Sequence, residues 1–237
     1  YESSSGIIAA ALGEKRIALT EYESKKILSS YGVPVVKETV AADPGEAVRA
    51  ADRFGYPVVV KGLGTRLTHK TDRGLVALSV GSADEVLSAA ARIAGAAGAD
   101  LEAFLVQPMM QGKREFVAGL FRDAQFGPVV MFGLGGTFTE VLDDVAFRLA
   151  PLNADEASQM IDQLRCAKLL GAFRGEAAVD RDALVAALVG LSRLAVDFPQ
   201  VVEVDINPLL AGADGSIRAV DALVVIGAEQ KTADVTE

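Results

Sequence analysis

Helix-start signals alternate with short β-branched runs along most of this 237-residue chain, and that alternation is what most restricts its fold. Thr20 and Glu23 have the spacing of a capping box, and so do Asn153 and Glu156. Between them lie runs such as residues 56–61 (Tyr-Pro-Val-Val-Val-Lys), which are typical of buried strands. This mixture predicts an α+β fold in two lobes, with a boundary near residue 106.

Composition narrows the range of functions. The 23 Lys and Arg residues against 32 Asp and Glu give a net charge of −9, whereas a nucleic-acid-binding face needs clustered cations. A single cysteine, Cys166, excludes an internal disulfide, and a single histidine, His69, excludes a zinc site with two histidines. The longest uncharged run, residues 124–139, has 16 residues, and a membrane span needs about 18. We expect a cytoplasmic protein with no nucleic-acid or membrane partner.

The last expected hairpin carries a row of polar side chains. Glu203, Asp205 and Asn207 alternate with apolar residues, so they share one face of their strand. If the turn centres on Asp214, Asn207 lies directly opposite Asp221. Amide and carboxylate oxygens side by side suit a hard cation such as Mg²⁺. The alternative is the solvated outer face of an edge hairpin.

Two segments are candidate phosphate contacts. Lys61 ends the apolar run at Gly62 and Gly64, so a rigid strand could deliver a compact cation to a phosphate. A lysine that reaches solvent from a strand end is the common alternative. Residues 133–136 (Gly-Leu-Gly-Gly) lack the spacing of a dinucleotide fingerprint. Their main-chain amides could still surround a phosphate.

His69 lies in a polar stretch between two expected strands, with Lys70 and Arg73 nearby. Imidazole is nucleophilic near neutral pH and can carry a phosphoryl group, and the neighbouring cations would favour an arriving phosphate. A solvated loop histidine is the alternative that composition alone favours.

Taken in order, these segments resemble the nucleotide-binding ATP-grasp subunit of the ADP-forming acyl-CoA synthetases of the acetate–CoA ligase type, which are related to succinyl-CoA synthetase. The resemblance runs from Leu19 to Ile226. The segments that carry it are residues 19–25 with 31–34, 56–61, 67–72, 126–128, 132–136 and 203–209.

The resemblance implies an ATP-grasp fold, in which two α/β lobes enclose a nucleotide. Residues 33–105 would form the amino-terminal lobe, and residues 14–32 with 106–226 the carboxy-terminal lobe. Residues 1–13 and 227–237 would be tails. The implied reaction is acyl-CoA + ADP + phosphate ⇌ carboxylic acid + CoA + ATP, with ATP or ADP and Mg²⁺ as cofactors. The implied partner is a CoA-binding alpha subunit, or fused domain, that carries the first phosphohistidine, so the chain would belong to a hetero-oligomer.

The resemblance also implies a role for each nucleotide contact. Lys61 would hold the nucleotide phosphates. Gln107 and the main chain through Met109 would line the adenine site, although succinyl-CoA synthetases tend to have an acid where this chain has Gln107. Glu115 would hold the ribose.

The remaining roles concern metal and transfer. Asn207 and Asp221 would hold Mg²⁺, with Asp205 one pleat away. His69 would take the phosphoryl group from the partner's histidine and pass it to the nucleotide. Further phosphate-side candidates are Arg148, Gly135 and Gly136.

Two other functions stay open at this point. One is a non-catalytic regulatory ATP-grasp domain, although such a copy should have lost some of Lys61, His69, Glu115, Asn207 and Asp221, and this chain keeps them all. The other is an ATP-grasp ligase that joins a carboxylate to an amine directly, which would not need His69.

Overall fold

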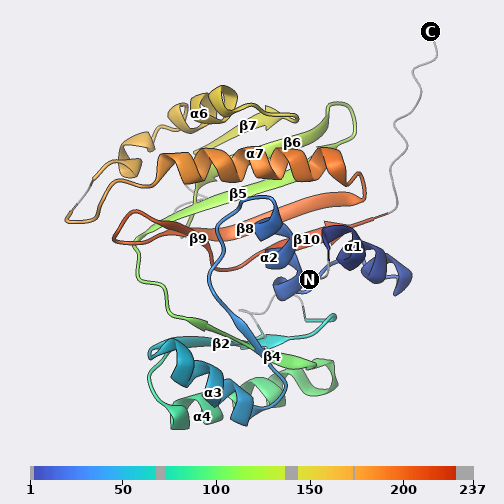
Figure 1. The fold of residues 1–237 in the computed structure, drawn as a ribbon, viewed down its shortest axis with the longest axis vertical. Coiled ribbons are helices and arrows are strands. Elements are labelled where there is room, and N and C mark those ends of the chain that lie inside the picture. The colour runs from blue at the N-terminus through green and yellow to red at the C-terminus, as the bar shows by residue number, and fades with distance from the viewer. Residues whose placement is uncertain (1–2, 68–72, 137–143, 173, 228–237) are drawn as a thin grey trace. The chain divides into compact units, whose positions relative to one another are not determined.

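The chain folds into two units, and one of them is inserted into the other. The structure, a computed structural model, describes residues 3–67, 73–136, 144–172 and 174–227. Unit 1 combines Tyr1–Val35 with Gln111–Glu237, and unit 2 is the continuous segment Val36–Met110 (Figure 1). Unit 2 extends past the predicted lobe boundary at residue 105, because its last strand continues to Pro108. No helix of the described residues is long and apolar enough to cross a membrane.

Unit 2 is a four-stranded antiparallel sheet with the strand order β1-β4-β2-β3 and two helices packed on one face (Figure 1). Asp43 caps one helix by accepting a hydrogen bond from the main-chain N–H of Glu46, and Ser82 caps the other in the same way through Glu85. The elements are β1 (Thr39–Ala41), α3 (Pro44–Phe54), β2 (Val58–Leu63), β3 (Val76–Val80), α4 (Ala83–Ala97), the 3₁₀ turn η1 (Gly98–Asp100) and β4 (Ala103–Pro108).

Unit 1 is built on a larger antiparallel sheet with the order β10-β8-β5-β6-β7, and the short β9 also pairs with β8. Helices α6 and α7 pack along one side of this sheet, and α1 and α2 join the same core near β10 (Figure 1). The elements are α1 (Ser4–Gly13), α2 (Glu21–Ser30), β5 (Arg114–Asp123), β6 (Gly127–Leu134), β7 (Val145–Leu149), α6 (Ala154–Asp162), the 3₁₀ turn η2 (Ala167–Leu170), α7 (Arg181–Asp197), β8 (Val201–Ala211), β9 (Ile217–Ala219) and β10 (Leu223–Ile226).

The core of unit 1 contains one apolar face of its longest helix, α7. The apolar stripe of α7, which includes Leu184, Leu188 and Leu191, is fully buried against the inward side chains of the sheet, such as Phe116 and Phe132. The predicted capping boxes at Thr20 and Asn153 are both present. These local signals therefore position the helices that cover one face of the sheet.

One expectation was wrong. Residues 1–13 were expected to be a tail, but Ser3 caps α1 and the apolar side chains Ile7, Ile8 and Ala11 are buried in the core of unit 1.

Cys166 lies in the turn before η2. Its main-chain N–H donates to the Asp144 carboxylate at 2.7 Å. Burial, and then the hydrogen bond from the thiol to Asp144, raise the pKa of Cys166 to about 12, so this thiol is structural.

Candidate functional site

In unit 2, Lys61 and Gln107 share the face of the sheet that α3 and α4 leave uncovered. Lys61 of β2 pairs with Leu105 of β4, and Gln107 of β4 pairs with Val59 of β2. These two pairs are two positions apart along the strands, so Lys61 and Gln107 point to the same face. Val58 and Val60, which alternate with these residues, belong to the core beneath the helices. Diagonal neighbours of this kind are about 7–8 Å apart, within reach of long side chains. Both polar side chains are buried, with 4% exposure for Lys61 and 3% for Gln107.

Met109 follows β4 at the end of the same unit. Its main-chain N–H donates to the carbonyl of Pro57 at 3.0 Å. The main-chain group that Met109 can still offer to an adenine is therefore its carbonyl. The predicted adenine contact at Met109 is therefore limited to its main-chain carbonyl oxygen, a hydrogen-bond acceptor.

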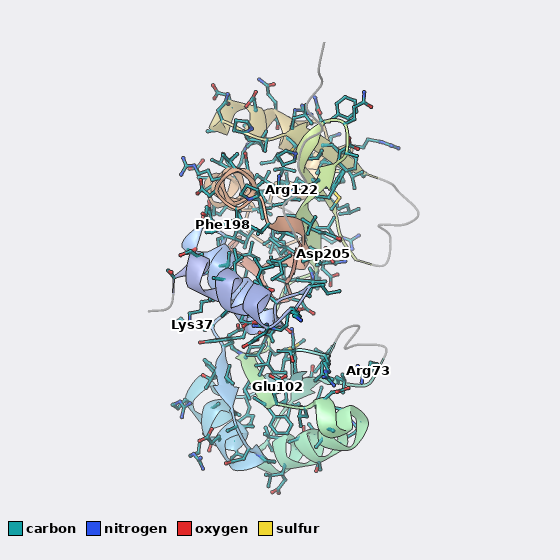
Figure 2. The ribbon with its side chains drawn as sticks, turned by 90° about the vertical axis from the view of Figure 1, so that its right-hand side faces the viewer. Lys37, Arg73, Glu102, Arg122, Phe198 and Asp205 are labelled. Carbon is teal, nitrogen blue, oxygen red and sulfur yellow. The ribbon has the colours of Figure 1, made fainter. Side chains whose placement is uncertain are left out.

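His69 lies outside the residues that the structure describes. The described residues on either side are anchored in unit 2. The main-chain N–H and hydroxyl of Thr65 both donate to Glu102, at 2.8 and 2.5 Å, and Leu75 is fully buried. Arg73, the first described residue after this segment, is exposed. Figure 2 labels both Glu102 and Arg73.

In unit 1, Glu115 meets the predicted glycine pair. The main-chain N–H of Gly135 donates to the carbonyl of Glu115 at 2.8 Å. A Cβ on Gly136 would lie 3.1 Å from a carboxylate oxygen of Glu115, and Gly136 has a φ of +79°, a conformation that favours glycine. The structure thus brings Glu115, Gly135 and Gly136 together where β6 ends.

The close approach at Gly135 leads to a testable expectation. A Cβ there would lie 2.9 Å from the carbonyl carbons of Glu115 and Phe116, and these are main-chain atoms that side-chain motion cannot relieve. We expect Gly135→Ala to reduce the free energy of unfolding of unit 1 by about 1–3 kcal/mol, measured by urea denaturation. Gly13→Ala is the matched control, because nothing lies within 4 Å of a Cβ at that position. Equal stability of the two variants would contradict the close approach.

The predicted centre of the last hairpin is confirmed. Leu209 pairs with Ala219, and Asp205 pairs with Leu223, so both pairs are centred on residue 214. The same register places Asn207 opposite Asp221, which lies in the short step between β9 and β10. Asn207 is exposed and Asp221 is half-buried.

Negative charge gathers on this face. Burial raises the pKa of Asp205, and the carboxylates of Glu203 and Asp221 raise it further; Figure 2 labels Asp205. A cation beside these groups would relieve their repulsion. Within the described parts of the chain, no three His, Cys, Asp or Glu side chains are grouped so that they could hold a metal ion. Asn207 and Asp221 offer one amide and one carboxylate, donors that suit Mg²⁺ whose shell is completed by phosphates and water, and Asp205 stays a predicted third ligand.

Arg148, a predicted phosphate contact, lies on the other face of the unit 1 sheet from the predicted metal ligands. It pairs with Val130, which is fully buried in the core beneath the helices of unit 1. Directly paired residues point to the same side of a sheet. Arg148 therefore lies on the opposite side from Asp205 and Asn207, and we leave it out of the site.

The sequence reasoning passed over a buried ion pair next to this hairpin. Lys25 Nζ lies 2.7 Å from Glu21 Oε1, and each side chain is 1% exposed. The spacing of four residues on a helix was visible in the sequence. Its burial was not, because it depends on the docking of α2 against β10.

The ATP-grasp domain family matches residues 10–226. The chain is 40% identical over 225 residues to the beta subunit of ADP-forming acetate–CoA ligase I of Pyrococcus furiosus, a match that covers 93% of this chain and 96% of that protein. It is 39% identical over 214 residues to ADP-forming acetate–CoA ligase I of Archaeoglobus fulgidus, which covers 87% of this chain but only 31% of that longer protein.

One similar solved structure is acetyl-coenzyme A synthetase 1 of Ca. Korarchaeum cryptofilum. The TM-score is 0.82 at 38% identity, and the match covers 95% of this chain and 100% of that one. That protein was solved with coenzyme A and Mg-AMPPCP, with its phosphohistidine segment pointing towards the nucleotide-binding site.

Proposed function

The chain belongs to the ATP-grasp family, and from that premise we propose that it is the nucleotide-binding subunit of an ADP-forming acyl-CoA synthetase. It works with a CoA-binding alpha subunit or domain and transfers a phosphoryl group between a phosphohistidine and ADP. The 40% identity over 225 residues to the beta subunit of an ADP-forming acetate–CoA ligase carries the proposal. Because its substrates are intracellular metabolites, we propose a cytoplasmic location.

The proposed transfer has two balanced steps. The partner's phosphohistidine loses its phosphoryl group as the P–N bond breaks, and a new P–N bond forms at the imidazole of His69. That bond then breaks as a β-phosphate oxygen of ADP bonds to phosphorus, which yields ATP and restores neutral His69. Protein groups contribute mainly positioning and charge neutralisation to such a transfer.

The other proposed roles follow from the chemistry of each face. Lys61 holds phosphate oxygens and Gln107 lines the adenine site, both from the uncovered face of unit 2. Glu115 holds the ribose, and Asn207 with Asp221 holds Mg²⁺, which would neutralise phosphate charge. The main-chain N–H of Gly135 already donates to Glu115, so we propose that Gly135 and Gly136 border the phosphate site of unit 1 without a hydrogen bond from the Gly135 amide.

The test separates nucleotide binding from turnover. We expect the 237-residue chain alone to bind Mg-ADP but to form no acyl-CoA from acid, CoA and ATP, since residues 10–226 are all matched by the ATP-grasp domain. Calorimetry measures the binding, and CoA-dependent ADP formation measures the turnover, with and without a CoA-binding partner.

The outcomes distinguish the candidate functions. Turnover that appears only with the partner supports the proposal. Turnover by the chain alone contradicts it, and amine-dependent ADP release without CoA would favour a direct ligase. Nucleotide binding that never leads to turnover with any partner would favour the regulatory domain.

A further inference from the structure

The Val220–Asp221 segment lies between two strands of the unit 1 sheet. It forms the step between β9, which ends at Ala219, and β10, which begins at Leu223. Asp221 Oδ1 accepts a hydrogen bond from the main-chain N–H of Ala222 at 2.9 Å, a contact with its own neighbour. The position of this carboxylate also depends on the contacts of Val220, the residue before it.

The buried ion pair of α2 contacts this step. Lys25 Nζ, held by Glu21 at 2.7 Å, also donates to the carbonyl of Val220 at 3.2 Å. The same helix anchors the next strand, because Ser24 Oγ accepts from the main-chain N–H of Val224 at 3.1 Å. The ammonium group thus fixes the peptide that immediately precedes Asp221.

Val220 also contacts strand β8, which lies opposite it. The main-chain N–H of Val220 donates to the carbonyl of Pro208 at 3.2 Å. Pro208 directly follows Asn207. Glu21, Lys25, Val220 and Pro208 therefore form one continuous chain of polar contacts, which spans the two main-chain positions next to Asn207 and Asp221.

We infer that Lys25 and Glu21 are positioning residues that set the spacing between Asn207 and Asp221. The inference rests on the proposed function, in which those two side chains hold Mg²⁺. A buried ion pair is weak evidence for stability, since apolar residues of similar volume often stabilise a fold as well or better. Partners that orient metal ligands, in contrast, commonly affect metal affinity about 10- to 100-fold.

The experiment measures metal binding rather than activity. Binding of Mn²⁺ at a fixed concentration of AMPPCP is followed by electron paramagnetic resonance, using the full chain. The test variant is Glu21→Gln/Lys25→Met, which removes both charges and so leaves no unpaired buried ion. Asp221→Ala serves as the reference for a lost ligand.

Arg122→Met is the matched control. Arg122 also belongs to unit 1 and donates to main-chain carbonyls, at 2.7 Å to Val201, 2.6 Å to Ala195 and 3.0 Å to Phe198. Figure 2 labels Arg122 and Phe198. The control removes a comparable set of contacts without touching Val220.

We expect the double variant to raise the Mn²⁺ dissociation constant about 10- to 100-fold, while Arg122→Met changes it less than about twofold and AMPPCP binding without metal is unchanged in both. Wild-type metal affinity in the double variant overturns the inference, and so does an equal loss in Arg122→Met. If Asp221→Ala itself binds Mn²⁺ like the wild type, the proposed metal site fails and this inference fails with it.

If the double variant does not fold, Lys25→Arg decides the question. It keeps the cation and the donor, so the inference expects metal affinity within about threefold of wild type, and Lys25→Gln should lose more. Equal affinity in these two variants contradicts a positioning role.

Discussion

Replacing His69 with alanine should reduce phosphoryl transfer between partner and nucleotide by at least about 1,000-fold, because loss of a nucleophile removes a covalent step that no neighbour can supply. The nucleotide dissociation constant should change less than about twofold, since the imidazole acts in transfer and not in binding. The measurement uses labelled phosphate with the reconstituted complex, followed by detection of acid-labile phosphohistidine on each chain.

The same experiment contains its own control. The partner's histidine should still become labelled in the complex with His69→Ala, which shows that the complex assembled and accepted phosphate. Labelling should then stop before the nucleotide. Near-normal turnover would reduce His69 to a solvated loop histidine and would leave a direct route from partner to nucleotide.

The second large effect is expected at Lys61. Lys61→Met should raise the dissociation constant for Mg-ADP about 10- to 100-fold, as expected when a charge-assisted hydrogen bond of about 1.5–3 kcal/mol is lost. Position 61 is 4% exposed within β2, so calorimetry of Mg-ADP binding is paired with thermal unfolding, which shows that the variant is folded.

Lys37→Met is the matched control for charge. Lys37 is an exposed residue of the same unit (Figure 2), so its loss removes one positive charge without touching the uncovered sheet face. An equal loss of Mg-ADP affinity in both variants would mean that Lys61 acts through long-range charge. Unchanged affinity in Lys61→Met would remove it from the phosphate site.

Local signals predicted much of the fold because the physics behind them is local. A side-chain oxygen that satisfies a main-chain N–H group three residues away marks a helix start in any context, and the two predicted caps at Thr20 and Asn153 are both present. The hairpin register depends only on where its turn lies. Asp214 closes that turn by accepting hydrogen bonds from Ser216 at 3.0 and 2.8 Å.

The rest depends on contacts between distant segments. The side of the sheet on which Arg148 lies follows from its pairing with β6, and a shift of one residue would reverse it. The tail that proved to be α1 has no charge pattern to mark it as a helix, and its burial needs a core that lies far along the chain. The burial of Lys25 likewise requires β10, and no window of sequence contains both.

The inserted arrangement of the units has a consequence for the order of synthesis. Unit 2 is one uninterrupted segment, so all of its strands are available once residue 110 has left the ribosome. The first helices of unit 1 are made earlier, yet their partners come last: Lys25 and Val220 are 195 residues apart in the chain. At typical rates of about 5–20 residues per second, α1 and α2 wait roughly 10–40 seconds with their apolar faces uncovered. The apolar faces of α1 and α2 therefore stay exposed during synthesis for longer than those of the elements of unit 2.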